Sequence, residues 1–145
     1  MIANERQYKV TKGAIEKFQN AIAEAKKGKP RKGVSLGVYK LQIESMIGQL
    51  ETLEEEVREY ERLISGTVKQ IDVDNLEQLP EGLIKARLAL NLTQRQLGER
   101  LSLKEQQIQR YEATRYASAS FARLVEIAEA LGVRIKERIF VREKA

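Results

Sequence analysis

The stretch from Leu92 to Gly132 reads LTQRQLGERLSLKEQQIQRYEATRYASASFARLVEIAEALG, and it decides the fold of the C-terminal half of the chain. Thr93 and Gln96 have the spacing of a capping box, which predicts the start of a helix. Ser102–Leu103 interrupts that helix, and a second helix is predicted over Lys104–Glu112. A short helix, a tight turn and a second helix form the helix-turn-helix arrangement.

The second helix of this pair has two different faces. Ile108 and Tyr111 are predicted to lie on its buried side. Its polar side chains are the candidate contacts to DNA bases: Glu105, Gln106, Gln107, Gln109 and Arg110. Gln and Arg bind the adenine and guanine edges bidentately in the major groove, so Gln106 and Arg110 are the best candidate base readers. Two amphipathic helices of an ordinary bundle are the alternative interpretation.

Residues 83–132 resemble the lambda-repressor-like (XRE) family of helix-turn-helix DNA-binding domains. The matching residues are Thr93-Gln94, Gly98, Leu101-Ser102-Leu103, Ile108, Arg110, Tyr111-Glu112, Leu124, Ile127-Ala128 and Leu131-Gly132. Three positions depart from the family pattern. Ser102 replaces a turn glycine, so a left-handed backbone there would be strained. Lys104 replaces a Ser or Thr cap, so the second helix could start at Ser102. Gly98 replaces an alanine and weakens the first helix.

The resemblance also implies where phosphates of the DNA backbone would bind. Gln94 would contact a phosphate at the helix start, where backbone amides and the helix dipole favour an anion. Lys104, Arg115 and Ser118 are the other candidate phosphate contacts. Arg115 and Tyr116 are expected to be exposed in a loop over residues 113–119. Ser120 is expected to cap a following helix whose inward residues begin with Phe121.

The composition excludes several classes of function. The 145 residues include no Cys and no His, so disulfides, a thiolate nucleophile, a His base and the commonest metal ligands are all absent. We therefore expect no catalytic site, metal or cofactor. No apolar run is long enough to span a membrane and no signal peptide is recognisable, so a cytoplasmic protein with no membrane partner is expected. The net charge of +5 suits a polyanionic partner.

The N-terminal part, residues 1–65, is predicted to be a helical hairpin. Its first helix would be capped by Thr11 and end at Lys26-Lys27-Gly28, before a basic loop over residues 28–37. A long helix over residues 38–65 would follow, with an unbroken heptad seam. The seam positions assigned to a homodimer interface are Ile43, Met46, Leu50, Leu53, Val57, Tyr60 and Ile64, preceded by Tyr39. An intramolecular helix pair alone is the alternative. The acidic run Glu54-Glu55-Glu56 is interpreted as a solvated face.

The remaining segments complete an all-α fold with two parts. Residues 66–79 are predicted to be a linker in which Asp74 caps a single turn. Residues 80–145 form the helix-turn-helix domain, with Pro80 opening its first helix. The apolar alternation over residues 133–141 predicts a short C-terminal β-strand. Such a strand must pair with residues 67–73, with a second copy or with another protein.

These patterns together predict a sequence-specific DNA-binding transcriptional regulator, most simply a repressor. As a dimer, it would bind double-stranded DNA at a pseudo-palindromic operator. The alternative is an antitoxin: small XRE proteins with extra segments resemble HigA-like antitoxins, which bind a toxin protein and repress their own operon.

Overall fold

The structure is a computed structural model that describes residues 1–142. In this part of the chain it contains α helices and one short 3-10 helix, and no strand, which confirms the predicted all-α class. The chain divides into two compact units, Met1–Val68 and Lys69–Ala145. Among the described residues, no helix is long and apolar enough to cross a membrane.

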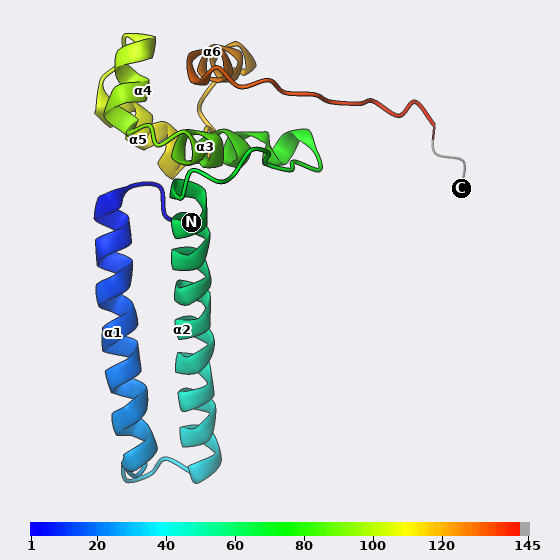
Figure 1. Cartoon of the computed structure of the whole chain (residues 1–145). Coiled ribbons are helices and arrows are strands. Elements are labelled where there is room, and N and C mark those ends of the chain that lie inside the picture. The colour runs from blue at the N-terminus through cyan, green and yellow to red at the C-terminus, as the bar shows by residue number, and fades with distance from the viewer. Residues whose placement is uncertain (143–145) are drawn as a thin grey trace. The chain divides into compact units, whose positions relative to one another are not determined.

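The first unit is a hairpin of two long antiparallel helices, α1 (Glu5–Lys27) and α2 (Leu36–Ile64), which Figure 1 shows in blue to green. The predicted start of α1 at Thr11 is wrong. Asn4 caps the helix instead, because its side chain accepts a hydrogen bond from the Gln7 amide at 2.8 Å. Thr11 lies inside the helix, and its hydroxyl donates back to the Gln7 carbonyl at 2.9 Å.

Tyrosine side chains connect the two helices of the hairpin near both ends. The rings of Tyr8 and Tyr60 stack with centroids 5.0 Å apart, and the Tyr8 hydroxyl donates to Glu61 at 2.6 Å. This hydrogen bond raises the pKa of Tyr8. Near the loop, the Tyr39 hydroxyl donates to the Ala25 carbonyl at 2.7 Å. Part of the predicted heptad seam therefore packs within one chain.

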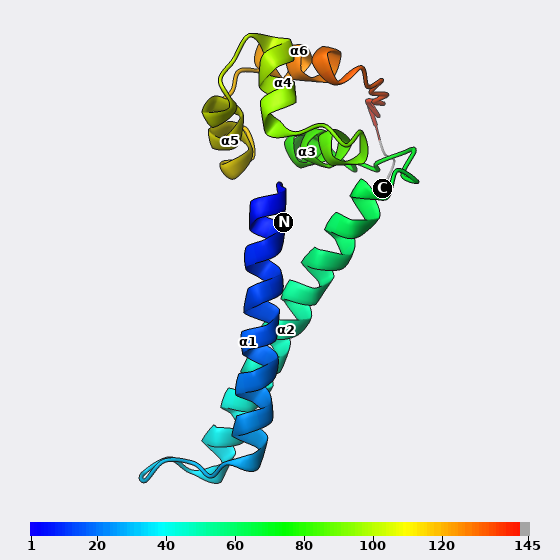
Figure 2. The same cartoon turned by 60° about the vertical axis from the view of Figure 1, so that its left-hand side comes forward.

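The second unit contains the 3-10 helix η1 (Leu76–Gln78) and four α helices. These are α3 (Leu79–Ala89), α4 (Gln94–Leu101), α5 (Glu105–Ala113) and α6 (Phe121–Leu131), which are labelled in Figure 2. Helix α4 packs against α5 and α6, and α3 packs against α6 and η1. The apolar side chains buried in this unit are Leu79, Leu83, Ile84, Leu88, Leu97, Ile108, Tyr116, Ile127 and Leu131. Asn75, and not Asp74, caps η1 by accepting from the Gln78 amide at 3.1 Å.

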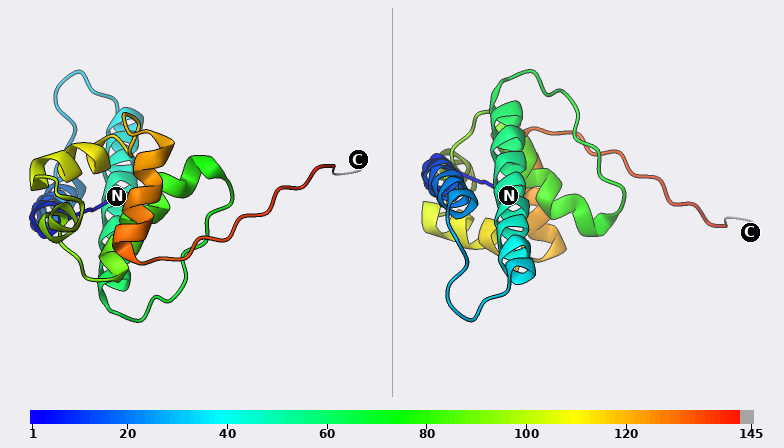
Figure 3. Two further views of the ribbon diagram at one scale, coloured as in Figure 1. Left: turned by 90° about the horizontal axis from the view of Figure 1, so that it is seen from above. Right: turned by 90° about the horizontal axis from the view of Figure 1, so that it is seen from below.

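The predicted C-terminal strand is absent from the described residues 133–142, which run out from α6 without regular structure (Figure 3, left). A lone strand leaves its backbone groups unpaired, and residues 67–73 form no ladder with it. Two burial predictions near α6 are also wrong. Phe121 is 67% exposed because it occupies the first, outward-facing position of the helix, whereas Tyr116 is 3% exposed and stacks on Tyr111.

Candidate nucleic-acid interface

Helix α4 begins with the capping box that the sequence predicts. The Thr93 hydroxyl accepts from the Gln96 amide at 3.1 Å, and the Gln96 side chain accepts from the Thr93 amide at 2.9 Å. Two of the amides that a helix start leaves without an intrahelical partner are thereby satisfied. This reciprocal pair fixes the direction in which α4 leaves the preceding loop.

The turn between α4 and α5 is tight because the backbone of Leu103 packs directly on the backbone of α4 at Gly98. Ser102 adopts the left-handed conformation with φ 55°, which the sequence identifies as a strained position for a non-glycine residue. The Leu103 amide donates to the Gly98 carbonyl at 2.8 Å. A Cβ atom on Gly98 would lie only 2.7 Å from the Leu103 carbonyl oxygen. Gly98 is therefore required for the turn, although it weakens the isolated helix.

Helix α5 begins after Lys104, and not at Ser102, where the sequence allowed a start. Lys104 occupies the N-cap position with extended backbone. Its own side chain has no acceptor atom, so the cap comes from inside the helix: the Gln107 side chain accepts from the Lys104 amide at 3.4 Å. Gln107 thus has a capping role in the free protein as well as a place on the outer face.

The outer face of α5 presents every side chain that the sequence assigns to base contacts. These residues are exposed in the structure: Glu105, Gln106, Gln107, Gln109 and Arg110. On the opposite side Ile108 is completely buried, and Tyr111 is half-buried. The Gln109 amide donates to Glu105 at 3.4 Å. Among the described residues, the Gln106 side chain and the Arg110 guanidinium form no hydrogen bond or ion pair.

The four residues assigned to DNA phosphates differ in accessibility. Lys104, Arg115 and Ser118 are exposed. Arg115 has a left-handed backbone with φ 50°, and its guanidinium lies 3.6 Å from Glu81. Gln94, in contrast, is 4% exposed, and its amide donates to Glu112 at 2.8 Å. A phosphate contact by the Gln94 side chain conflicts with this burial, so only the backbone of that helix start remains available for an anion.

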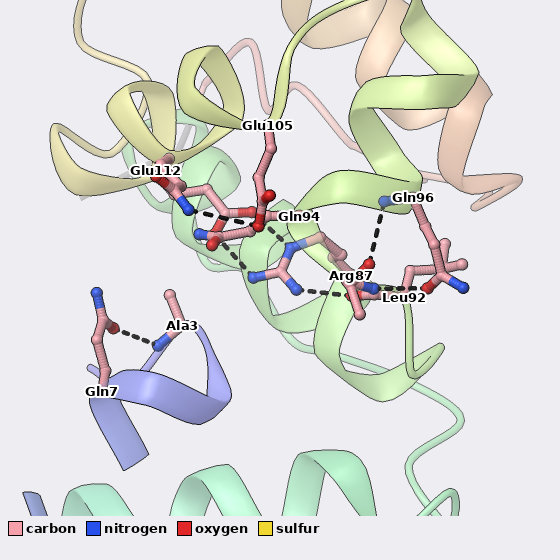
Figure 4. Close-up of polar contacts among 10 residues, drawn as sticks. Ala3, Gln7, Arg87, Leu92, Gln94, Gln96, Glu105 and Glu112 are labelled. Carbon is pink, nitrogen blue, oxygen red and sulfur yellow. Dashed lines mark hydrogen bonds and ion pairs between the residues drawn. The ribbon is translucent and has the colours of Figure 1, made fainter. Parts of the chain in front are cut away.

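A buried polar cluster of Arg87, Gln94 and Glu112 lies behind this surface (Figure 4). Arg87 binds Glu112 through two parallel hydrogen bonds of 2.6 and 2.7 Å, and it also donates to the Leu92 carbonyl at 2.7 Å. One carboxylate therefore connects α3, α4 and α5. Sequence reasoning missed this cluster, although Arg87 stands on the buried face of α3 beside Leu83 and Leu88, where a lone charge requires a partner.

Two groups near the interface have shifted pKa values. The Lys85 ammonium hydrogen-bonds Glu81 and holds the pKa of that carboxyl below its usual range, and Arg115 acts in the same direction. Burial raises the pKa of Tyr116 well above its usual value, and the charge of Glu112 adds to this effect. In the described residues the Tyr116 hydroxyl has no hydrogen-bond partner. No group of His, Cys, Asp and Glu residues suited to a metal ion occurs in that part of the chain.

In a comparison with known protein families, residues 83–138 match the helix-turn-helix family model. This match confirms the resemblance of residues 83–132 to the lambda-repressor-like type of helix-turn-helix segment. The match begins within α3 and extends past α6, so it covers the capped helices, the tight turn and the exposed face of α5. Neither the curated proteins nor the solved structures contain a match to the chain.

Proposed function

We propose that this protein is a transcription regulator that reads a DNA sequence with the outer face of α5. The observation that carries this proposal is the division of α5 into two faces. Five polar side chains over residues 105–110 are exposed, while Ile108 between them is completely buried. A face of that length and polarity fits the major groove, which admits an α-helix. The helix-turn-helix match over residues 83–138 supports DNA as the partner.

The side chains of α5 suit different bases. Arg110 would bind guanine through O6 and N7, and Gln106 would bind adenine through N6 and N7. Glu105 accepts hydrogen bonds only, so it favours a cytosine amino group and rejects an acceptor in the same place. Gln107 and Gln109 would give up their bonds to Lys104 and Glu105 in exchange for base contacts. They therefore contribute less net affinity than Gln106 and Arg110.

Phosphate contacts would set the register of α5 in the groove. Lys104 and Ser118 are exposed on either side of α5, and Arg115 follows its C-terminal end. The ion pair of Arg115 with Glu81 is long, at 3.6 Å, so a phosphate can replace the carboxylate at small cost. The backbone amides at the start of α4 add a favourable site for a further phosphate.

Selection of bound DNA from a random pool tests the proposal directly, since it gives the half-site, its symmetry and the specificity ratio. Arg110→Ala should cost about 1–3 kcal/mol of binding free energy and relax one base position. Arg115→Ala should weaken binding to all sequences and lower the salt slope by about one. Arg123→Ala is the matched control, because Arg123 also forms an exposed ion pair, with Glu126 on α6. Unchanged affinity and base preference in Arg110→Ala would refute the docking of α5.

We further propose that the protein acts as a dimeric repressor on a pseudo-palindromic operator, with the hairpin as the dimer interface. The seam residues Ile43, Met46, Leu50 and Leu53 stay half-buried after α1 has packed on α2. Val57 and Tyr60 are each only 7% exposed, so this part of the seam has little accessible apolar surface that a second copy could bury. Repression would follow from operator occupancy that blocks the polymerase.

Light scattering decides whether the dimer exists. The double substitution Leu50→Lys with Leu53→Lys should give monomers, because dimerisation would bury two unpaired charges. These monomers should lose the benefit of a linked second contact, commonly a factor of about 100 in affinity for the full operator. A wild-type monomer at tens of micromolar, with and without operator DNA, would exclude the dimer.

A second candidate function, an antitoxin that binds a toxin protein, is favoured by the C-terminal tail. Ile139, Phe140 and Val141 are 92%, 73% and 90% exposed, an unusual density of exposed apolar side chains. Such a segment can add to the sheet edge of a partner. Co-expression with a small toxin-like reading frame beside this gene provides the test. Removal of residues 133–145 should abolish rescue of growth and leave operator binding intact, whereas rescue by the truncated chain would exclude this role for the tail.

A further inference from the structure

The hairpin buries its apolar seam unevenly along its length. In α2 the buried residues are Val57, Tyr60 and Leu63, all near its C-terminal end. Between Leu36 and Leu53 no residue of this helix is buried, although the seam continues there with one apolar residue every three or four positions. Leu36 and Leu41 in this section are 59% and 64% exposed. In a hairpin of only two helices, one apolar side of the pair stays exposed to solvent. A second hairpin would cover that side by forming a four-helix bundle.

The hairpin is also polarised in charge. Its loop half, residues 17–49, contains seven Lys or Arg against two Glu. Its other half, residues 1–16 with 50–64, contains five Lys or Arg against eight Glu. The cations at the loop are Lys26, Lys27, Lys29, Arg31 and Lys32, and they form no ion pair within the described residues. In the same part of the chain Glu51 and Glu55 on α2 are exposed and make none either.

We propose that two hairpins pair in antiparallel orientation, so that the basic loop of each lies beside Glu51 and Glu55 of the other. This inference rests on the proposed dimer and specifies its orientation. Parallel pairing would place loop against loop and acid against acid, which like charges oppose. Antiparallel pairing places opposite charges together at two symmetric positions. It also lets each hairpin cover the apolar section from Leu36 to Leu53 of the other.

The rise of an α-helix fixes the register. Glu51 and Glu55 lie on average about 17 residues beyond Leu36, or about 26 Å along α2. The two-fold axis then passes about 13 Å from the loop, beside Glu44. This places the axis in the middle of the section of α2 that lacks buried residues. The charge pattern and the burial pattern therefore indicate the same register independently.

The register has a consequence for the DNA-binding domains. The C-terminal ends of the two α2 helices, where the linkers begin, would lie roughly 60 Å apart along the bundle. Parallel pairing would bring them side by side, at a helix-to-helix spacing of about 10 Å or a small multiple of it. Antiparallel hairpins therefore favour half-sites about two turns of DNA apart over half-sites one turn apart.

Distances between spin labels test the orientation, and the absence of native cysteines makes single labels straightforward. Arg62→Cys places a label near the end of α2, and Glu44→Cys places one beside the proposed axis. In the full-length dimer we expect about 50 Å between labels at position 62 and about 20 Å between labels at position 44. Distances near 20 Å at both positions would establish the parallel dimer and overturn the proposal.

Charge reversal gives a second readout that does not depend on labels. Lys29→Glu with Arg31→Glu should raise the dimer dissociation constant roughly tenfold, as should Glu51→Lys with Glu55→Lys. The chain with all four substitutions should recover wild-type dimerisation, because the charges are exchanged. Arg6→Glu with Arg62→Glu is the matched control, since these exposed residues lie about 13 Å beyond the level of the partner's Leu36. A fourfold variant as weak as the two double variants would overturn the proposal.

These outcomes separate the orientation from the function proposed above. A dimer with short distances at both label positions refutes only the antiparallel arrangement. A monomer in light scattering removes the dimer and the orientation together, and leaves the reading of DNA by α5 to be tested with a single half-site.

Discussion

Removal of the charge on Glu112 should destabilise the second unit far more than removal of an exposed charge. Arg87 and Glu112 have side chains that are 2% and 1% exposed, and they meet at 2.6 Å. Breaking a buried pair from one side leaves the other charge uncompensated, which costs about 3–5 kcal/mol. Glu112→Gln keeps the shape of the side chain, so the loss would come from electrostatics and hydrogen bonding and not from a cavity.

Hydrogen exchange followed by mass spectrometry measures this loss separately for each unit. The slowest amides of α3, α4 and α5 report the free energy of unfolding of their own unit. Glu126→Gln is the control, because the Arg123–Glu126 pair has a similar length of 2.7 Å but is 31% and 53% exposed. That variant should lose less than about 1 kcal/mol. Equal losses in Glu112→Gln and Glu126→Gln would refute the electrostatic reasoning.

Three further substitutions have distinct expected outcomes. Gly98→Ala should lower the stability of its unit by about 1–3 kcal/mol, because the new Cβ would lie 2.7 Å from the Leu103 carbonyl oxygen. Gly48→Ala in α2 is its control and should raise stability by about 0.5–1 kcal/mol, since nothing lies within 4 Å of the added atom. Tyr116→Phe should preserve stability at neutral pH, because the buried hydroxyl has no partner among the described residues. It should also reduce the loss of stability above about pH 10, where unfolded tyrosine ionises and the raised pKa of Tyr116 keeps the folded form protonated. Ile108→Ala should lower the melting temperature, with a loss of about 2–5 kcal/mol for a buried Ile. Thermal melts and hydrogen exchange check all of these.

The features that sequence reasoning predicts correctly here are local. The capping box of Thr93 and Gln96, the Ser120 cap and the Gly132 end of α6 are each fixed by residues within one helical turn. The exposed face of α5 follows from the helical repeat around the buried Ile108. These elements interact over three or four positions, so their physics is contained in a short window of sequence.

The features that sequence reasoning misses depend on distant partners. Asn4 and Thr11 are both acceptable caps, and the stacking of Tyr8 on Tyr60 favours the longer helix by packing its first turns on α2. The tail alternates like a strand, but no local signal supplies the neighbouring strand that it requires. Arg87 and Glu112 are 25 residues apart, and their pairing depends on how α3 and α5 meet.

The buried polar cluster separates the positioning of α5 from the reading of DNA. Glu112 accepts from Arg87 of α3 and from Gln94 at the first turn of α4, so one carboxylate at the end of α5 fixes three helices. None of these side chains is accessible to a base. The side chains that are accessible, such as Gln106 and Arg110, contribute little to the packing of the unit. The outer face of α5 can therefore change without loss of the fold, whereas a change in the cluster would alter the angle at which any such face enters the groove.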